Sequence, residues 1–102
     1  MKERIAKFDW DRVQEVACEF ANAVIMEDVV LSESKRESVM DLLDELEIKY
    51  GERARITATR GDFLENPHEA EKCFERALEL SRAENDPEEE FEILDSIRRL
   101  ES

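Results

Sequence analysis

The spacing of apolar residues along the chain predicts a series of amphipathic helices. Over residues 9–26 and 34–50, apolar residues recur every three or four positions, as they do along the buried face of a helix. No stretch alternates strictly between apolar and polar residues, the pattern of a half-buried strand. The first face consists of Trp10, Val13, Val16, Ala17, Phe20, Ala21 and Val24, and the second of Val39, Leu42, Leu43, Leu46 and Tyr50. We therefore expect an all-α protein.

Residues that favour helix ends set the expected boundaries in the first half. Asp9 is a good N-cap for the first helix. Ser34, with Glu37 three residues later, matches the capping box, so we expect residues 32–34 to separate the apolar run at 29–31 from a helix beginning near Ser34. Gly51 then ends this helix as a left-handed C-cap.

The second half shows the same signals more clearly. A short helix is expected over residues 52–62, and Asn66 and Asp86, each followed by proline, predict helix starts at 67 and 87. The fourth helix, ending near Asn85, should bury Ala70, Cys73, Phe74, Ala77, Leu78 and Ser81, and the fifth Phe91, Ile93, Leu94, Ile97 and Leu100. The expected architecture is about five antiparallel helices, in a bundle or a short α-solenoid, as one domain over residues 1–102 with a helix pair in 1–50 and the remainder in 51–102.

The charge of the chain limits its partners. The formal net charge is −13, divided as −6 over residues 1–50 and −7 over residues 51–102. This sign disfavours nucleic acid and anionic membranes, since both need Lys/Arg patches. It suits either the general solubility of an acidic protein or the attraction of a basic protein partner. The N-terminal residues do not resemble a signal peptide and no segment has the apolar length of a membrane helix, so we expect a cytoplasmic protein.

Few residues capable of catalysis are present. The chain has one histidine, His68, two glycines and two cysteines, and it contains no metal-binding or phosphate-binding motif. Cys18 and Cys73 are far apart among apolar helical positions, which predicts buried free thiols. We expect no enzyme activity, no cofactor and no metal.

The segment 70–80 resembles the second helix of a tetratricopeptide repeat. In that family an alanine, an aromatic residue four positions later and an alanine three further on precede a Leu-x-Leu pattern, and here these positions hold Ala70, Phe74, Ala77, Leu78 and Leu80. The resemblance implies that residues 52–62 form the first helix of a hairpin and that residues 87–100 form a capping helix. It also implies a protein-binding surface on the first helix, with Glu52, Arg55, Thr59 and Asp62 facing the partner.

Two hypotheses for function follow. The first is a non-catalytic protein–protein interaction module: an adaptor, a regulator or a small chaperone. The second is an acidic inhibitor of a basic protein, such as an immunity protein for a nuclease-type toxin or a nucleic-acid mimic. Six acids between residues 84 and 92 serve either as helix capping or as a docking patch that includes Glu88, Glu89 and Glu92. The apolar run at 29–31 is also compatible with a homodimer.

Overall fold

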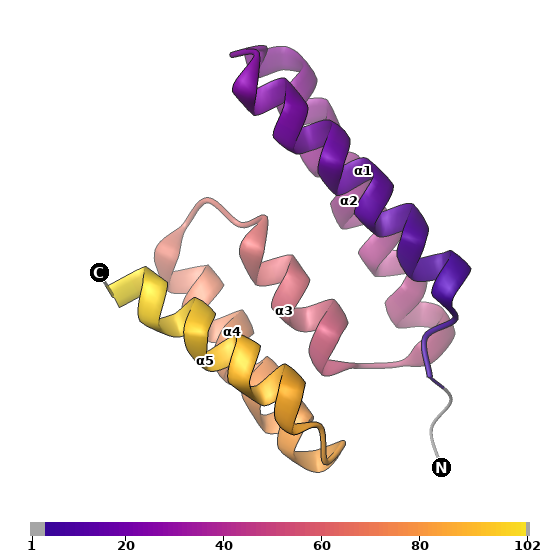
Figure 1. Cartoon of the computed structure of the whole chain (residues 1–102), viewed down its shortest axis with the longest axis vertical. Helices are drawn as coiled ribbons and strands as arrows, with labels where there is room; N and C mark the ends of the chain where they lie inside the picture. Colours follow the sequence, from indigo (N-terminus) through magenta and orange to yellow (C-terminus); the bar gives the residue numbers. More distant parts are fainter. Residues whose placement is uncertain (1–3, 102) are drawn as a thin grey trace. The chain divides into compact units, whose positions relative to one another are not determined.

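The structure is a computed structural model that describes residues 4–101, and it consists of helices joined by short connections (Figure 1). The five helices are α1 (Lys7–Ile25), α2 (Val29–Tyr50), α3 (Ala54–Asp62), α4 (Pro67–Ala83) and α5 (Pro87–Glu101). No strand occurs in the described part of the chain, so the prediction of an all-α fold with about five helices is confirmed. The chain divides into two compact units, Met1–Tyr50 and Gly51–Ser102.

The first unit is a hairpin of α1 and α2. Its buried apolar residues are Val13 and Ala23 on α1 and Val39, Leu43 and Leu46 on α2. The face predicted for the second helix is therefore correct. The face predicted for the first helix is only partly correct, because Val24 and Ala21 are exposed while Ala23 is buried.

The start of α1 differs from the prediction. The helix begins at Lys7, Ala6 is its N-cap, and Asp9 lies inside the first turn. Asp9 is buried, and its carboxylate accepts hydrogen bonds from the Tyr50 hydroxyl at 2.6 Å and the Lys49 ammonium at 2.9 Å, which offset the cost of burying the charge. The Tyr50 hydroxyl in turn accepts from the Ala6 backbone N–H at 3.1 Å. Asp9 thus joins the two ends of the hairpin instead of capping a helix.

The predicted break at residues 32–34 is wrong, as is the Ser34 cap. α1 ends in a Schellman motif, in which the Asp28 N–H donates to the Ala23 carbonyl at 2.9 Å and Glu27 adopts a left-handed φ of 58°. The Asp28 carboxylate then accepts from the Leu31 N–H at 3.0 Å, so α2 begins at Val29 and Ser34 lies within it. Asp28 takes the capping role because it directly follows the left-handed residue.

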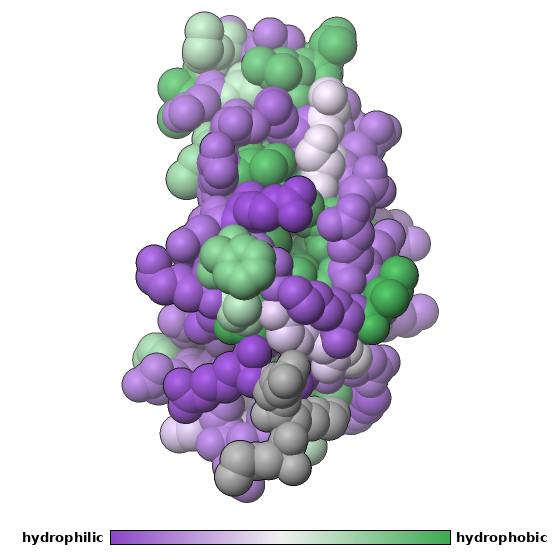
Figure 2. Space-filling view, turned by 90° about the vertical axis from the view of Figure 1, so that its right-hand side faces the viewer, coloured by the Kyte–Doolittle hydropathy of each residue, from purple (hydrophilic) through white to green (hydrophobic). Residues whose placement is uncertain are grey.

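The apolar run therefore forms the first turn of α2 at the tip of the hairpin. Six apolar residues here are exposed: Val24, Ile25, Met26, Val29, Val30 and Leu31. Figure 2 shows hydrophobic residues gathered at this tip, at the top of the view. We call these six residues the apolar tip.

The second unit contains α3, α4 and α5 around its own core. Two of its predicted caps are confirmed: Asn66 accepts from the N–H groups of His68 and Glu69, and Asp86 accepts from the Glu89 N–H at 3.1 Å. Gly51, with φ 81°, follows α2 in the left-handed conformation, as predicted. α3 begins at Ala54 instead of residue 52, and α4 ends at Ala83.

The predicted burial of Cys18, of Cys73 and of the apolar face of α5 needs correction. Cys18 is exposed and Cys73 is only half-buried, because the buried face of α4 continues through Leu80 and not through Cys73. On α5 only Ile93 is buried, and Phe91 is 71% exposed. The face of α5 that meets its neighbours is centred on Ile93, so Phe91 points away from it.

Candidate functional site

Small residues bring the helices of the second unit close together. α3 and α5 both pack on α4 and also contact each other. The shared core consists of Ala54, Ala58, Ala70, Phe74, Ala77, Leu80 and Ile93. Alanine at four of these positions lets neighbouring helices approach closely, while Phe74 fills the space between them.

Gly61 is part of this close approach. A Cβ atom at this position would lie 2.9 Å from Cε1 and 3.1 Å from Cζ of the Phe74 ring. Because the ring is almost fully buried, it occupies the volume that any larger residue at position 61 would need. The Phe74 ring and Gly61 therefore set the distance between α3 and α4.

At the start of α3, a basic side chain faces an acid of α5. Nε of Arg55 lies 3.9 Å from Oε2 of Glu89. The Glu89 side chain is only 13% exposed, and this burial raises the pKa of its carboxyl group, whereas Arg55 acts in the opposite direction. Two residues predicted on separate grounds, Arg55 from the family resemblance and Glu89 from the acidic run, are thus neighbours.

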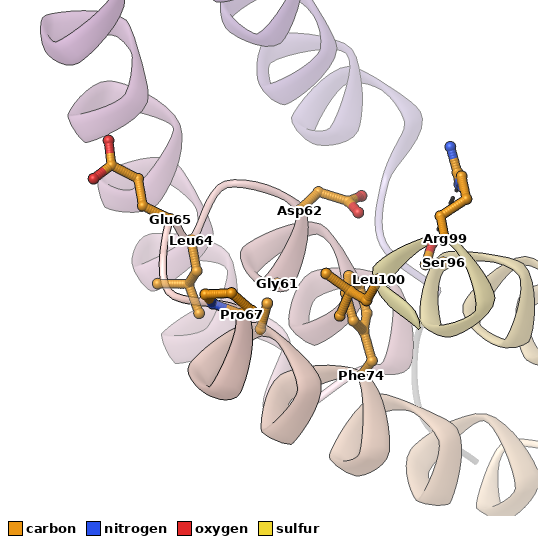
Figure 3. Close-up of a pocket in the computed structure, with 10 residues that line it drawn as sticks. Gly61, Asp62, Leu64, Glu65, Pro67, Phe74, Ser96, Arg99 and Leu100 are labelled. Carbon is orange, nitrogen blue, oxygen red and sulfur yellow. Dashed lines mark hydrogen bonds between the residues drawn. The ribbon is translucent and has the colours of Figure 1, made fainter. Parts of the chain in front are cut away.

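At the other end of α3, Asp62 borders a pocket of about 260 Å³. Figure 3 shows Gly61, Phe74 and Leu100 gathered between the helices here, with the Asp62 carboxylate pointing toward the end of α5 that carries Arg99. Asp62 is exposed as a residue, but its carboxyl group is partly desolvated, which raises its pKa, and the charge of Arg99 opposes this shift.

The positions of these four residues show how the helices are aligned. Arg55 and Glu89 lie near the starts of α3 and α5, whereas Asp62 and Arg99 lie near their ends. The two helices therefore run in the same direction, side by side, on α4. We define the α3–α5 surface as Arg55, Thr59 and Asp62 of α3 with Glu88, Glu89 and Glu92 of α5.

The remaining predicted residues differ in their positions. Glu88 and Glu92 are exposed on α5, and Thr59 is half-buried on α3. Glu52 pairs with Arg76 of α4 and not with α5, and Arg76 also binds Glu79 at 3.0 Å. The structure thus pairs Glu52 with α4, whereas Arg55 pairs with α5.

Two polar contacts in the structure were not predicted from the sequence. Glu84, just after α4, accepts a hydrogen bond from the Ala54 N–H at 2.9 Å and so caps α3 from a distant part of the chain. In the first unit, the hydrogen bonds of Asp9 hold the pKa of its carboxyl group below the usual value, with Tyr50 the larger cause and Lys49 the next. Neither contact has a signal in the spacing of residues, because each joins segments far apart in the sequence.

The described residues contain no group of three or more His, Cys, Asp or Glu side chains arranged to hold a metal ion. His68 is exposed in the first turn of α4. Burial raises the pKa of the Cys73 thiol, which keeps it in the unreactive protonated form. Within residues 4–101 no helix has both the length and the apolar character needed to cross a membrane.

Comparisons of the chain with protein-family models, with curated proteins and with solved structures give no significant match.

Proposed function

We propose that this protein is a non-catalytic protein–protein interaction module of tetratricopeptide-like type, acting as an adaptor, a regulator or a small chaperone, and that it binds its partner through the α3–α5 surface. The observation that carries the proposal is the parallel placement of α3 and α5 on α4: Arg55 pairs with Glu89 near the starts of the two helices, and Asp62 and Arg99 line one pocket near their ends. In tetratricopeptide-like arrays, first helices aligned in this way form the binding surface.

The packing of the second unit supports the same reading. Small residues at Ala70 and Ala77 flank Phe74 on α4, and Gly61 of α3 lies against the Phe74 ring. This close packing positions α3 on α4, so that its outward side chains are presented on a defined helix before a partner arrives. Preorganisation of this kind reduces the entropy lost on binding.

The partner is expected to be a protein with basic groups. Glu88 and Glu92 are exposed on α5, next to the partly neutralised pair of Arg55 and Glu89. Lys or Arg side chains of a partner would meet an excess of carboxylates on this surface, which increases the rate of encounter.

The test is affinity capture from a lysate of the source organism with the tagged full chain, at low and at high salt. Two variants are compared with the wild type: Glu92→Lys, on the α3–α5 surface, and Glu71→Lys, an exposed glutamate of α4 outside that surface. We expect Glu92→Lys to lose the captured protein and Glu71→Lys to retain it. Equal capture by both variants, or no capture by the wild type at either salt, would overturn the proposal.

The negative charge favours a second candidate, an acidic inhibitor of a basic protein such as a nuclease-type toxin. The same experiment separates the two. Capture of a single stoichiometric basic partner that is lost at high salt supports the inhibitor, whereas capture of several unrelated proteins supports the adaptor.

A further inference from the structure

The first unit carries a second surface, the apolar tip, that its own fold leaves uncovered. Four of its residues are more than two-thirds exposed: Ile25 at 77%, Met26 at 78%, Val29 at 71% and Val30 at 83%. They are adjacent because the end of α1 and the start of α2 meet at the turn. A contiguous exposed apolar patch is typical of a binding site.

None of the tip side chains belongs to the buried core of the hairpin. Its buried contacts come from Val13 and Ala23 on α1 and from the Val39, Leu43 and Leu46 face on α2. Ile25, Met26, Val29 and Val30 therefore expose most of their hydrophobic area, whereas Val24 and Leu31 are about half covered.

The charges around the tip indicate the kind of partner. Residues 13–34 contain five acids and no Lys or Arg. Glu19 pairs with Lys35 at 2.7 Å and Glu33 with Arg36 at 2.7 Å, so α2 bases just beyond this segment neutralise two of the acids. Glu15, Glu27 and Asp28 make no ion pair with a described Lys or Arg, and Glu27 and Asp28 lie in the turn of the tip itself.

Three kinds of partner could cover the apolar tip: a second copy of the chain, a membrane or another protein. The acids around the tip disfavour the first two. A second copy of the chain would bring the same acids into contact, on a molecule of net charge −13. An anionic membrane would repel the turn for the same reason. A cationic partner is attracted by the acids and can also cover the apolar side chains.

We propose that the apolar tip binds a cationic amphipathic helix of a partner protein, whose apolar face covers Met26, Val29 and Val30 and whose Lys or Arg side chains meet Glu27 and Asp28. An amphipathic helix presents an apolar stripe beside cationic side chains, the two features that the tip and its acids would bind. This site is separate from the α3–α5 surface and does not depend on the function proposed for it.

The test uses the full chain and a fluorescently labelled synthetic helix of leucine and lysine, about 18 residues long, or five turns. Binding is measured by fluorescence anisotropy for the wild type, for the tip variant Met26→Ser with Val30→Ser, and for a matched control, Ile48→Ser. Ile48 is 87% exposed in the same unit but lies near the other end of α2. We expect the tip variant to bind at least tenfold more weakly and the control to stay within twofold of the wild type.

A second pair of variants tests the charge. Glu27→Lys should weaken binding severalfold, whereas Glu71→Lys in the second unit should not, and Glu92→Lys should leave this binding unchanged even where it abolishes capture through the α3–α5 surface. Circular dichroism verifies that each variant remains helical.

Three outcomes would overturn the proposal. The first is equal weakening by Ile48→Ser and by the tip variant, which would mean that the peptide binds acidic protein without using the tip. The second is a dimeric wild type and a monomeric tip variant in analytical ultracentrifugation, which would assign the tip to a second copy of the chain. The third is tip-dependent binding to vesicles of phosphatidylglycerol, which assigns it to a membrane.

Discussion

Replacing Gly61 by alanine tests whether the close approach of α3 to α4 is set by the Phe74 ring. Within a helix, the change from glycine to alanine alone stabilises by up to about 1 kcal/mol. Here the new Cβ would lie 2.9 Å from the ring, a distance that requires the ring or the helix to move. Overpacking of this kind costs about 1–3 kcal/mol, so we expect a net loss of about 1 kcal/mol in the free energy of unfolding.

The sign should reverse when the ring is removed. Phe74→Leu alone is expected to cost about 1–3 kcal/mol, because it leaves a cavity beside Gly61. In that background the alanine methyl fills part of the cavity and the helix propensity is no longer opposed, so Gly61→Ala should stabilise by about 1 kcal/mol. The double-mutant cycle therefore predicts a coupling energy of about 2 kcal/mol between the two positions.

Hydrogen exchange of the backbone amides of α4 is the suitable assay, because it reports on the second unit directly. The single Trp and Tyr, Trp10 and Tyr50, both lie in the first unit, so fluorescence follows that unit separately. Additive effects of the two substitutions, within about 0.5 kcal/mol, would show that the ring does not limit the approach of α3 and would refute this reasoning.

Three further predictions concern stability. Asn66→Ala should lower the free energy of unfolding by about 1 kcal/mol in a denaturant titration, whereas Asn66→Asp, which keeps the cap, should change it little. Glu27→Gly should raise it by about 0.5–1 kcal/mol in the same titration, because Glu27 occupies a left-handed conformation in which glycine has no Cβ strain. Asp9→Asn should destabilise the first unit at neutral pH more than Asp11→Asn does, as followed by Trp10 fluorescence. Since the folded-state pKa of Asp9 lies below the unfolded value of about 3.9, the advantage of the wild type over Asp9→Asn is full above that value and should disappear as the pH falls through the folded-state pKa.

The sequence predicted most accurately those helix starts that depend only on neighbouring residues. The starts of α4 and α5 were predicted at the correct residues because Asn66–Pro67 and Asp86–Pro87 combine a capping side chain with a residue suited to the first turn. The start of α2 was missed because Asp28, Ser32 and Ser34 all offer a capping side chain within a few residues. The choice among them depends on the left-handed turn at Glu27, which nothing in the sequence marks.

What depends on distant partners was not predictable in this way. Asp9 has the residue type of an N-cap, but the hydroxyl of Tyr50 and the ammonium of Lys49 give its carboxylate better partners across the hairpin. The family resemblance and the acidic run each supplied residues of the α3–α5 surface. Only the folded chain places Arg55 beside Glu89, whereas it directs Glu52 to Arg76.

The structure shows where the negative charge lies relative to the apolar tip, which the composition alone does not. Counted by halves, the negative charge is nearly even, at −6 and −7, and it describes only an acidic protein. On the hairpin, residues 13–34 contain no Lys or Arg, and this stretch includes the whole apolar tip. Glu27 and Asp28 lie in the turn between α1 and α2. An exposed apolar patch on a neutral background would promote self-association. The same patch among carboxylates repels copies of itself and admits a cationic helix, so the acids that look like a general property of the chain give this surface its selectivity.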